Sequence, residues 1–206
     1  MFTGIIQDVG RITLIEREAE QSHMQFQTTL DMSSWQLGDS VAVDGCCLTI
    51  TDFPNPQQWS ATLSLETLNL THFTDATIGQ RVNMEPALRM GDAMGGHIVT
   101  GHIDGLSQLK SLQNIGEHRV LSFEAPADLA RYIVKKGSVT INGVSLTVND
   151  VDECCFTVNL IPHTLSHTNL DDLLENHWVN LETDMLGRYV ERIMHFQPKA
   201  HDFSTP

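Results

Sequence analysis

The sequence predicts an all-β protein made of two homologous six-stranded Greek-key barrels in tandem, followed by a C-terminal α-helix. Three observations support this fold class. An internal repeat divides the 206 residues into two similar halves. Short β-branched segments separated by turn residues recur through both halves, which is typical of small antiparallel barrels. The last regular segment differs, because its apolar residues recur at helical spacing.

The repeat is clearest in two segments, DGCCLTIT at 44–51 and NGVSLTVN at 142–149. Further matches keep the same order along the chain after a register change of one residue. They pair Thr3-Gly4 with Thr100-Gly101, Thr67-Leu68 with Thr164-Leu165, and VNME at 82–85 with VNLE at 179–182. We therefore predict a first repeat at residues 1–96 and a second at residues 97–193.

Each half supplies about six strand candidates. Asp44-Gly45 and Asn142-Gly143 indicate hairpin turns, since both central residues of such a turn take positive φ. The other expected strands are 10–15, 23–29, 59–65 and 81–85 in the first half, and 106–112, 118–124, 155–160 and 178–182 in the second. A helix is expected from Pro126 to Lys136, with proline near its start and Gly137 at its end.

The segment from Met185 to Met194 is predicted to be helical, within a C-terminal helix at residues 185–196. An isolated helix this short is marginal, so its apolar side must dock on another surface, in the same chain or in a second subunit. That side consists of Leu186, Tyr189, Val190, Ile193 and Met194. Residues 197–206 are expected to form a disordered tail.

Composition excludes several classes of function. The net charge of −14 opposes binding to nucleic acid or to an anionic membrane surface. No stretch approaches the roughly 20 apolar residues of a membrane span, and no leader sequence is recognisable. The four cysteines form two adjacent pairs, which suit neither a local disulfide nor a CxxC metal site. A cytoplasmic protein that binds a small molecule is the expectation.

The repeated segment presents short polar side chains on one face of a strand. Alternation places Cys47 and Thr49 opposite the apolar face in the first copy, and Ser145 and Thr147 in the second. Such a face could simply be exposed to solvent. It also suits a planar heterocycle with several donors and acceptors, and a free thiol is usually kept away from an open surface.

Between the copies lies GGHIVTGHID at 95–104, with His97 and His102. Their odd separation puts them on opposite sides of an extended strand, and no cysteine or carboxylate stands at ligand spacing, which disfavours a metal site. One histidine that moves protons is the better functional interpretation, and a structural hydrogen bond is the simpler one. The GxGxxG, Walker and GxSxG motifs are all missing, which argues against nucleotide binding and acyl transfer.

The sequence resembles the riboflavin synthase family over about residues 1–194. The resemblance rests on MFTGII, GCCLT, GGHIVTGH, NGVSLT, LIPHT and YVER, taken together and in order. It implies four-carbon transfer between two molecules of 6,7-dimethyl-8-ribityllumazine, with no metal and no redox cofactor. It also implies a homotrimer in which the first barrel of one subunit faces the second barrel of a neighbour, so that each site holds two lumazines, and it admits an association with lumazine synthase.

The resemblance also assigns residues. Cys47, His102, Ser145 and Thr147 are candidates for catalysis, with His102 as base or relay and Ser145, Cys47 or a bound water as nucleophile. Gly4, Ile5 and Ile6 are expected near the second-barrel ligand, and Lys136 is expected to reach a neighbouring subunit's site. The full substrate-binding set is Phe2, Gly4, Ile5, Ile6, Ser40, Cys47, Leu48, Thr49, Thr62, Leu63, Ser64, Leu65, Glu66, Thr67, Gly101, His102, Ile103, Lys136, Ser145, Leu146, Thr147, Leu160, Ile161, Pro162, His163, Thr164 and Asp184.

Two alternatives share the fold. A non-catalytic antenna-type paralogue would bind lumazine or flavin without turnover, but such paralogues have lost much of the GCCLT, GGHxxxGH and SLT set that this chain keeps. A flavin-binding barrel of a reductase would need a nicotinamide-binding domain, for which a duplicated chain of 206 residues leaves no room.

Overall fold

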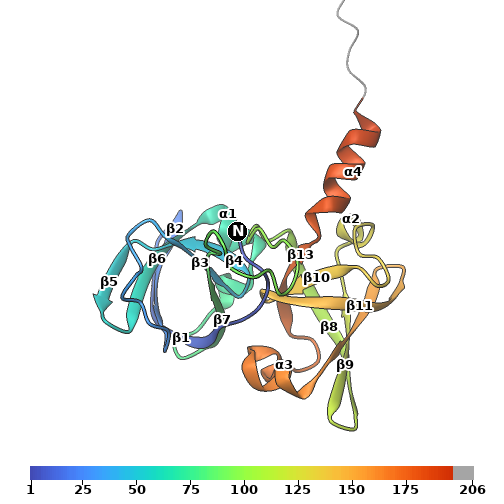
Figure 1. The fold of residues 1–206 in the computed structure, drawn as a ribbon, viewed down its shortest axis with the longest axis horizontal. Helices are drawn as coiled ribbons and strands as arrows, with labels where there is room; N and C mark the ends of the chain where they lie inside the picture. Colours follow the sequence, from blue (N-terminus) through green and yellow to red (C-terminus); the bar gives the residue numbers. More distant parts are fainter. Residues whose placement is uncertain (197–206) are drawn as a thin grey trace, which may run out of the picture.

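The computed structural model describes residues 1–196 as two barrels side by side, with the last helix projecting from the second (Figure 1). This confirms the predicted fold class of two tandem barrels and a C-terminal helix. The expected tail at 197–206 lies outside the described residues. Within residues 1–196 no helix is both long and apolar enough to cross a membrane.

The first barrel contains seven strands in the order β4-β3-β7-β1-β2-β6-β5. The strands are β1 (Asp8–Arg17), β2 (Gln21–Gln27), β3 (Ser40–Val43), β4 (Cys46–Thr49), β5 (Asp52–Asn55), β6 (Gln58–Ser64) and β7 (Arg81–Pro86). The predicted count of six is therefore wrong for this half. The extra strand arises because one strand is interrupted at Ile50 and Thr51, which separate β4 from β5. The N–H of Thr51 donates to Ser60 O at 2.8 Å. The two edges, β4 and β5, are thus consecutive in the chain.

The second barrel is closed by strand pairing in the order β10-β11-β12-β9-β8-β13. Its six strands are β8 (Gly105–Ile115), β9 (His118–Glu124), β10 (Ser138–Ile141), β11 (Val144–Asp152), β12 (Cys155–Leu160) and β13 (Trp178–Thr183). Here β11 is continuous where the first barrel has β4 and β5. The same sequence pattern therefore gives an intact strand in one copy and a broken strand in the other.

Each barrel encloses its own apolar core. Phe26 and Trp59 pack with ring centroids 4.8 Å apart in the first, and Phe123 and Phe156 pack at 5.6 Å in the second. All four side chains are fully buried. Burial of each such side chain contributes about 1.5–3 kcal/mol. Each barrel thus has a separate core of its own.

The short helices repeat as well. β6 runs into α1 (Leu65–Leu70) and η1 (His72–Asp75), and β12 runs into α3 (Pro162–His167) and η2 (Asn169–Asp172). The helix expected over 126–136 is mostly wrong, since α2 covers only Ala127–Ala130. Beyond it the N–H groups of Tyr132 and Ile133 bond three residues back, as in tight turns, and Ile133 enters the second core. The chain therefore leaves α-helical geometry in the same stretch where the β-branched side chain of Ile133 is buried.

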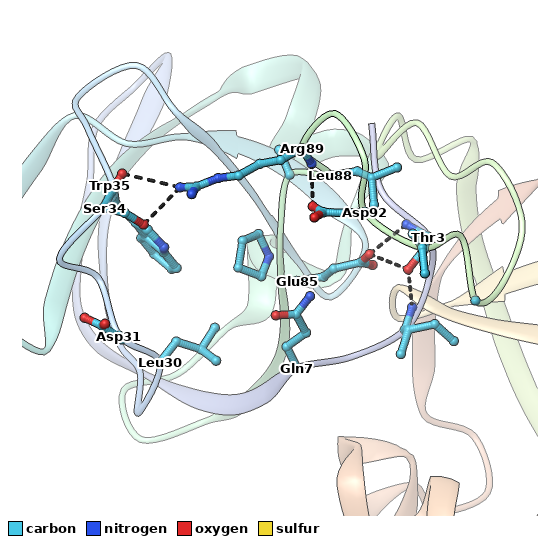
Figure 2. A pocket seen from close by; sticks show the side chains of 15 residues that line it. Thr3, Gln7, Leu30, Asp31, Ser34, Trp35, Glu85, Leu88, Arg89 and Asp92 are labelled. Atoms are coloured by element: carbon cyan, nitrogen blue, oxygen red, sulfur yellow. Dashed lines mark hydrogen bonds between the residues drawn. The ribbon is translucent and has the colours of Figure 1, made fainter.

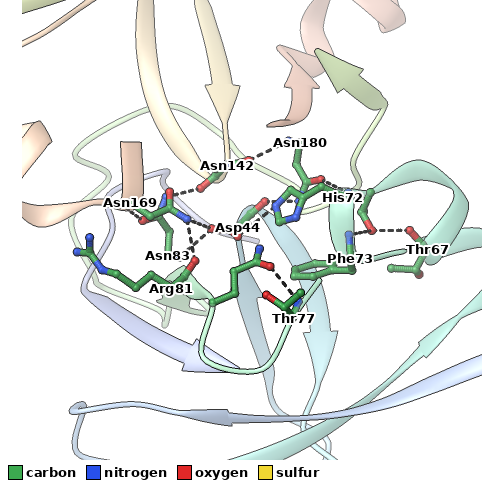
Figure 3. A network of polar contacts seen from close by, with 12 residues as sticks. Asp44, Thr67, His72, Phe73, Thr77, Arg81, Asn83, Asn142, Asn169 and Asn180 are labelled. Atoms are coloured by element: carbon green, nitrogen blue, oxygen red, sulfur yellow. Dashed lines mark hydrogen bonds and ion pairs between the residues drawn. The ribbon is translucent and has the colours of Figure 1, made fainter. Parts of the chain in front are cut away.

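The two barrels are joined by a buried polar network that has approximate two-fold symmetry (Figure 3). Asn83 Nδ2 donates to Asn142 O at 2.8 Å, and its repeat counterpart Asn180 Nδ2 donates to Asp44 O at 2.9 Å. Asn169 Nδ2 adds a bond to Asp44 Oδ1 at 2.8 Å. Because an unpaired buried polar group costs about 1–3 kcal/mol, these bonds fix the mutual orientation of the barrels.

The final helix, α4 (Met185–His195), begins at Asp184, whose carboxylate accepts the N–H of Leu186 at 3.0 Å. The apolar stripe forms on one side as predicted. Within residues 1–196 it stays exposed, since Tyr189 is 60% exposed and Ile193 is 74% exposed. Of the two docking surfaces considered above, the part of the chain that the structure describes therefore does not supply one.

Candidate active site

Each barrel brings together three segments that carry expected site residues. In the first barrel these are β4, the junction of β6 with α1, and the connecting segment at Gly101–Ile103. In the second barrel they are the start of β11, the junction of β12 with α3, and the N-terminal segment at Gly4–Ile6. The segments lie together because the stretch of chain at the start of each repeat lies against the barrel of the other repeat. We call these two stretches, Gly4–Ile6 and Gly101–Ile103, the crossing segments.

The crossing segments are held by matched backbone bonds. Cys47 N–H donates to Gly101 O at 2.8 Å, and Ser145 N–H donates to Gly4 O at 2.8 Å. Ile6 packs against the core of the second barrel, although it belongs to the first repeat. The expectation that the N-terminal segment lies near the second-barrel site agrees with these contacts.

Glycine is required at both crossings. Gly4 and Gly101 have φ values of 76° and 81°, a region that other residues rarely adopt. A Cβ atom on Gly4 would stand 2.5 Å from Ser145 Cβ, and a Cβ atom on Gly101 would stand 2.6 Å from Cys47 Cβ. The backbone can therefore lie directly against Cys47 and Ser145 only because Gly101 and Gly4 have no side chain.

Two buried carboxylates anchor the crossings. Glu85 accepts the N–H and hydroxyl of Thr3, both at 2.7 Å, and Gly4 N–H at 2.9 Å. Glu182 makes the corresponding three bonds to Thr100 and Gly101 at 2.7–3.0 Å. Burial raises the pKa of both carboxyl groups, and the hydrogen bonds oppose that rise. The repeats thus share a scaffold that extends well behind the site.

The two sites differ in the groups that the scaffold carries. His97 Nδ1 lies 2.7 Å from Ser145 Oγ, and its Nε2 lies 3.3 Å from the buried hydroxyl of Thr140. Burial lowers the pKa of His97, while the negative charge of Asp184 opposes that shift. The imidazole is therefore mainly neutral near pH 7 and can accept the serine proton. Ser145 has a base within hydrogen-bond distance.

Cys47 has a different environment. It is half-buried against Phe2, Ala42 and Val99. His102, which follows Gly101 in the chain, is exposed. His102 uses its backbone N–H to bond Thr100 Oγ1 at 3.2 Å. The first-barrel site therefore combines a sheltered thiol with an accessible imidazole.

The other expected residues occupy two kinds of position. Leu48, Leu63, Leu146 and Leu160 are buried in the barrel cores, so any contact they make with a ligand would come from the backbone. Around the first site, Thr49 and Glu66 are exposed, and Ser64 caps α1 by accepting Thr67 N–H at 3.2 Å. Positions with exposed or half-buried side chains also include Ser40, Thr62, Leu65, Lys136, Thr147, Ile161, Pro162, His163, Thr164 and Asp184.

Sequence reasoning left His97 outside the set of site residues, although GGHIVTGH contains it. The signal was its position in a glycine-rich segment before the second repeat, but spacing alone could not show which histidine meets Ser145. A second missed contact joins His23 Nδ1 to Thr62 Oγ1 at 2.9 Å across β2 and β6. His23 has no sequence motif around it.

A cavity of about 590 Å³ lies at the end of the first barrel (Figure 2). Ile5 is the one expected site residue that lines it. Thr3 and Glu85 form one wall, and Arg89, held by Ser34 Oγ at 3.0 Å, forms another. Among residues 1–196 no three His, Cys, Asp or Glu side chains come close enough to hold a metal ion.

The sequence is similar to those of known proteins. Residues 3–87 and 100–184 each match the lumazine binding domain family. Riboflavin synthase of Actinobacillus pleuropneumoniae is 39% identical over 198 residues, covering 96% of this chain and 92% of that protein. Riboflavin synthase of Bacillus subtilis (strain 168) is 35% identical over 205 residues, covering 100% of this chain and 94% of the relative.

Solved structures of LumP have the same fold. The LumP complex with 6,7-dimethyl-8-(1'-D-ribityl) lumazine superposes with a TM-score of 0.81 at 25% identity, covering 89% of this chain and 99% of that one. The riboflavin complex gives 0.82 at 27% identity, covering 89% and 100%. With two lumazine binding domains and relatives of this similarity along its length, the chain belongs to the riboflavin synthase family of transferases.

Proposed function

We propose that the protein is a riboflavin synthase, with residues 1–96 and 97–193 as its two lumazine-binding repeats. It would convert two molecules of 6,7-dimethyl-8-ribityllumazine into riboflavin and 5-amino-6-(D-ribitylamino)uracil, the last step of riboflavin biosynthesis. The relatives named riboflavin synthase at 35–39% identity support the assignment. So does the chemistry of the two sites.

The observation that carries the proposal is that the same backbone scaffold occurs twice, with a thiol beside it in one copy and a hydroxyl in the other. Glu182 holds one crossing segment against Cys47, and Glu85 holds the equivalent segment against Ser145. A reaction between two identical molecules needs two similar pockets, because both substrates have the same shape. It also needs the pockets to differ, because one substrate gives four carbons and the other receives them.

The residues suit this chemistry. The C7 methyl of the lumazine is acidic because its carbanion delocalises into the ring, so a modest base suffices, and the exposed His102 is available for that role. A nucleophile that adds to the other ring would prepare it as donor. Among the candidates Ser145, Cys47 and water, Ser145 has a neutral imidazole 2.7 Å from its hydroxyl. Holding two rings in register could itself supply about 7–11 kcal/mol of the barrier.

We further propose a homotrimer with sites between subunits, in the cytoplasm. The exposed apolar stripe of α4 supports assembly, since such a surface in water favours association. Ile193→Glu should then shift the mass measured by light scattering from trimer to monomer, whereas Arg192→Glu, on the polar side, should not. All four cysteines are free thiols, which agrees with a reducing compartment.

The test is direct. Purified protein is mixed with the lumazine alone, and riboflavin is followed by absorbance and fluorescence. Riboflavin should appear at half the amount of lumazine consumed. The structural likeness to LumP keeps an antenna-type paralogue as second candidate, which would bind lumazine and form no riboflavin. Binding without turnover would overturn the proposal in favour of that candidate.

A further inference from the structure

Two histidines stand one helical turn apart at the edge of the second-barrel site. His163 and His167 lie on α3, and both are exposed. Residues four apart on a helix occupy the same face. Their rings stack with centroids 4.0 Å apart and planes 28° from parallel. The two imidazoles thus lie close together on one face, where both could reach one ion after the rings turn out of the stacked arrangement.

The hydrogen bonds of His167 prepare it as a metal ligand. Its Nδ1 lies 2.8 Å from both His163 O and Ser166 Oγ. The carbonyl oxygen can only accept and the hydroxyl can do either, so a proton on Nδ1 satisfies both contacts and leaves the lone pair on Nε2. Metal-bound histidines generally donate their other ring N–H in this way, which fixes both tautomer and orientation. Ser166 Oγ, which donates to the same carbonyl at 3.0 Å, steadies this acceptor.

The counterpart helix in the first barrel lacks the pair. α1 carries Glu66 and Leu70 at the corresponding positions. No hydrogen bond within residues 1–196 uses a ring nitrogen of His163, so both its nitrogens are available. The pair is therefore not needed for the shared barrel fold, and it belongs to the second site alone.

We propose that His163 and His167 bind a divalent transition-metal ion of the Zn²⁺ or Cu²⁺ class, and that the bound ion obstructs the second-barrel pocket. Nε2 of His167 and one ring nitrogen of His163 would replace two water ligands, and water would keep the other positions. No further His, Cys, Asp or Glu within residues 1–196 completes a three-residue site. The ion would thus be held reversibly. The obstruction rests on the proposed function, because His163 and Thr164 are expected ligand contacts.

Metal binding is tested first, without any lumazine. Zn²⁺ is titrated into the full chain by calorimetry, and Cu²⁺ is examined by electron paramagnetic resonance. We expect one ion per chain at this site with two nitrogen ligands. His167→Gln should weaken binding roughly 10²-fold, because the second imidazole no longer acts at high effective concentration. His118→Gln, an exposed histidine on β9, is the matched control.

The site would be overturned if His167→Gln kept wild-type affinity, or if His118→Gln lost as much. Obstruction is then tested by titrating the lumazine with and without Zn²⁺. Zinc should weaken lumazine binding in the wild type and leave it unchanged in His167→Gln, whose zinc-free binding should equal that of the wild type. Equal weakening in both proteins would overturn the obstruction. A chain that binds zinc at this pair yet makes no riboflavin would refute the proposed function and leave the metal site standing.

Discussion

The first and second barrels share a scaffold but differ in the surroundings of their candidate catalytic side chains, Cys47 and Ser145. In the first, Cys47 is packed against apolar residues and the nearest conspicuous histidine, His102, is exposed. In the second, Ser145 meets the half-buried His97 at 2.7 Å. The comparison teaches that duplication supplied two equivalent backbone scaffolds, and that a few side chains beside them made the two chemically unequal.

The source of the difference is the connecting segment. His97 lies between the two stretches that match the family, 3–87 and 100–184, so it has no matched counterpart in the first repeat. A residue without a counterpart is free of the requirement to serve both barrels. His97 can therefore specialise toward Ser145 without disturbing the first site.

The largest effect is expected from His97→Gln, which removes the base beside Ser145 and keeps a side chain able to form hydrogen bonds. Turnover should fall by roughly 10²–10⁴-fold, the usual contribution of general acid–base catalysis. His102→Gln is the matched change at the first site. Single-turnover kinetics would measure both. If only His102→Gln impaired the reaction, our assignment of the more important histidine would be wrong.

The next effect concerns the crossing itself. Gly101→Ala should destabilise the protein by about 2–4 kcal/mol, since it combines backbone strain with overpacking against Cys47. Gly79→Ala is the control, because Gly79 also has positive φ, at 90°, but open space around its Cβ position. Its cost should be about 1–2 kcal/mol from the backbone alone. Urea unfolding measures both, and equal losses would show that close approach to Cys47 is unimportant.

Cys47→Ser makes the first site resemble the second. We expect a slower reaction with lumazine binding largely retained, a smaller loss than that of His97→Gln, because hydroxyl replaces thiol in a nearly unchanged volume. Binding is read from lumazine fluorescence and rate from riboflavin formation. Weaker binding with normal turnover of the bound complex would make Cys47 a packing residue.

The smallest effect is on pH dependence. Burial lowers the pKa of His97 below its usual value near 6.5, so the neutral, proton-accepting form persists to lower pH. Turnover should therefore hold as the pH falls to 6.5 and decline only below it. The acid limb should disappear in His97→Gln. An acid limb centred above pH 6.5 would contradict the lowered pKa as its origin.

Much of this architecture could be predicted from sequence. The strands β9 and β12 have the expected bounds, because short β-branched runs between turns leave little freedom. The apolar stripe of α4 could be predicted from its helical pattern, but its exposure within residues 1–196 could not. The helix expected at 126–136 failed because Ile133 is used by the second core, a tertiary effect that local pattern does not contain.

The site was harder to predict. Resemblance indicated Ser145 and Cys47, but the contact from His97 spans 48 residues and depends on how the connecting segment lies between the barrels. The break between β4 and β5 was likewise hidden, since both repeats have similar patterns there. Both features depend on tertiary contacts, which the local sequence pattern does not contain.

The central claim is that each chain offers two unlike places to two like molecules. The most direct measurement is equilibrium titration of the full protein with a lumazine that lacks the reactive methyl groups, followed by fluorescence and calorimetry. We predict two bound molecules per chain with two distinct affinities, and Ser145→Ala should alter only one of them. One molecule per chain, or two that respond equally to that substitution, would contradict the account.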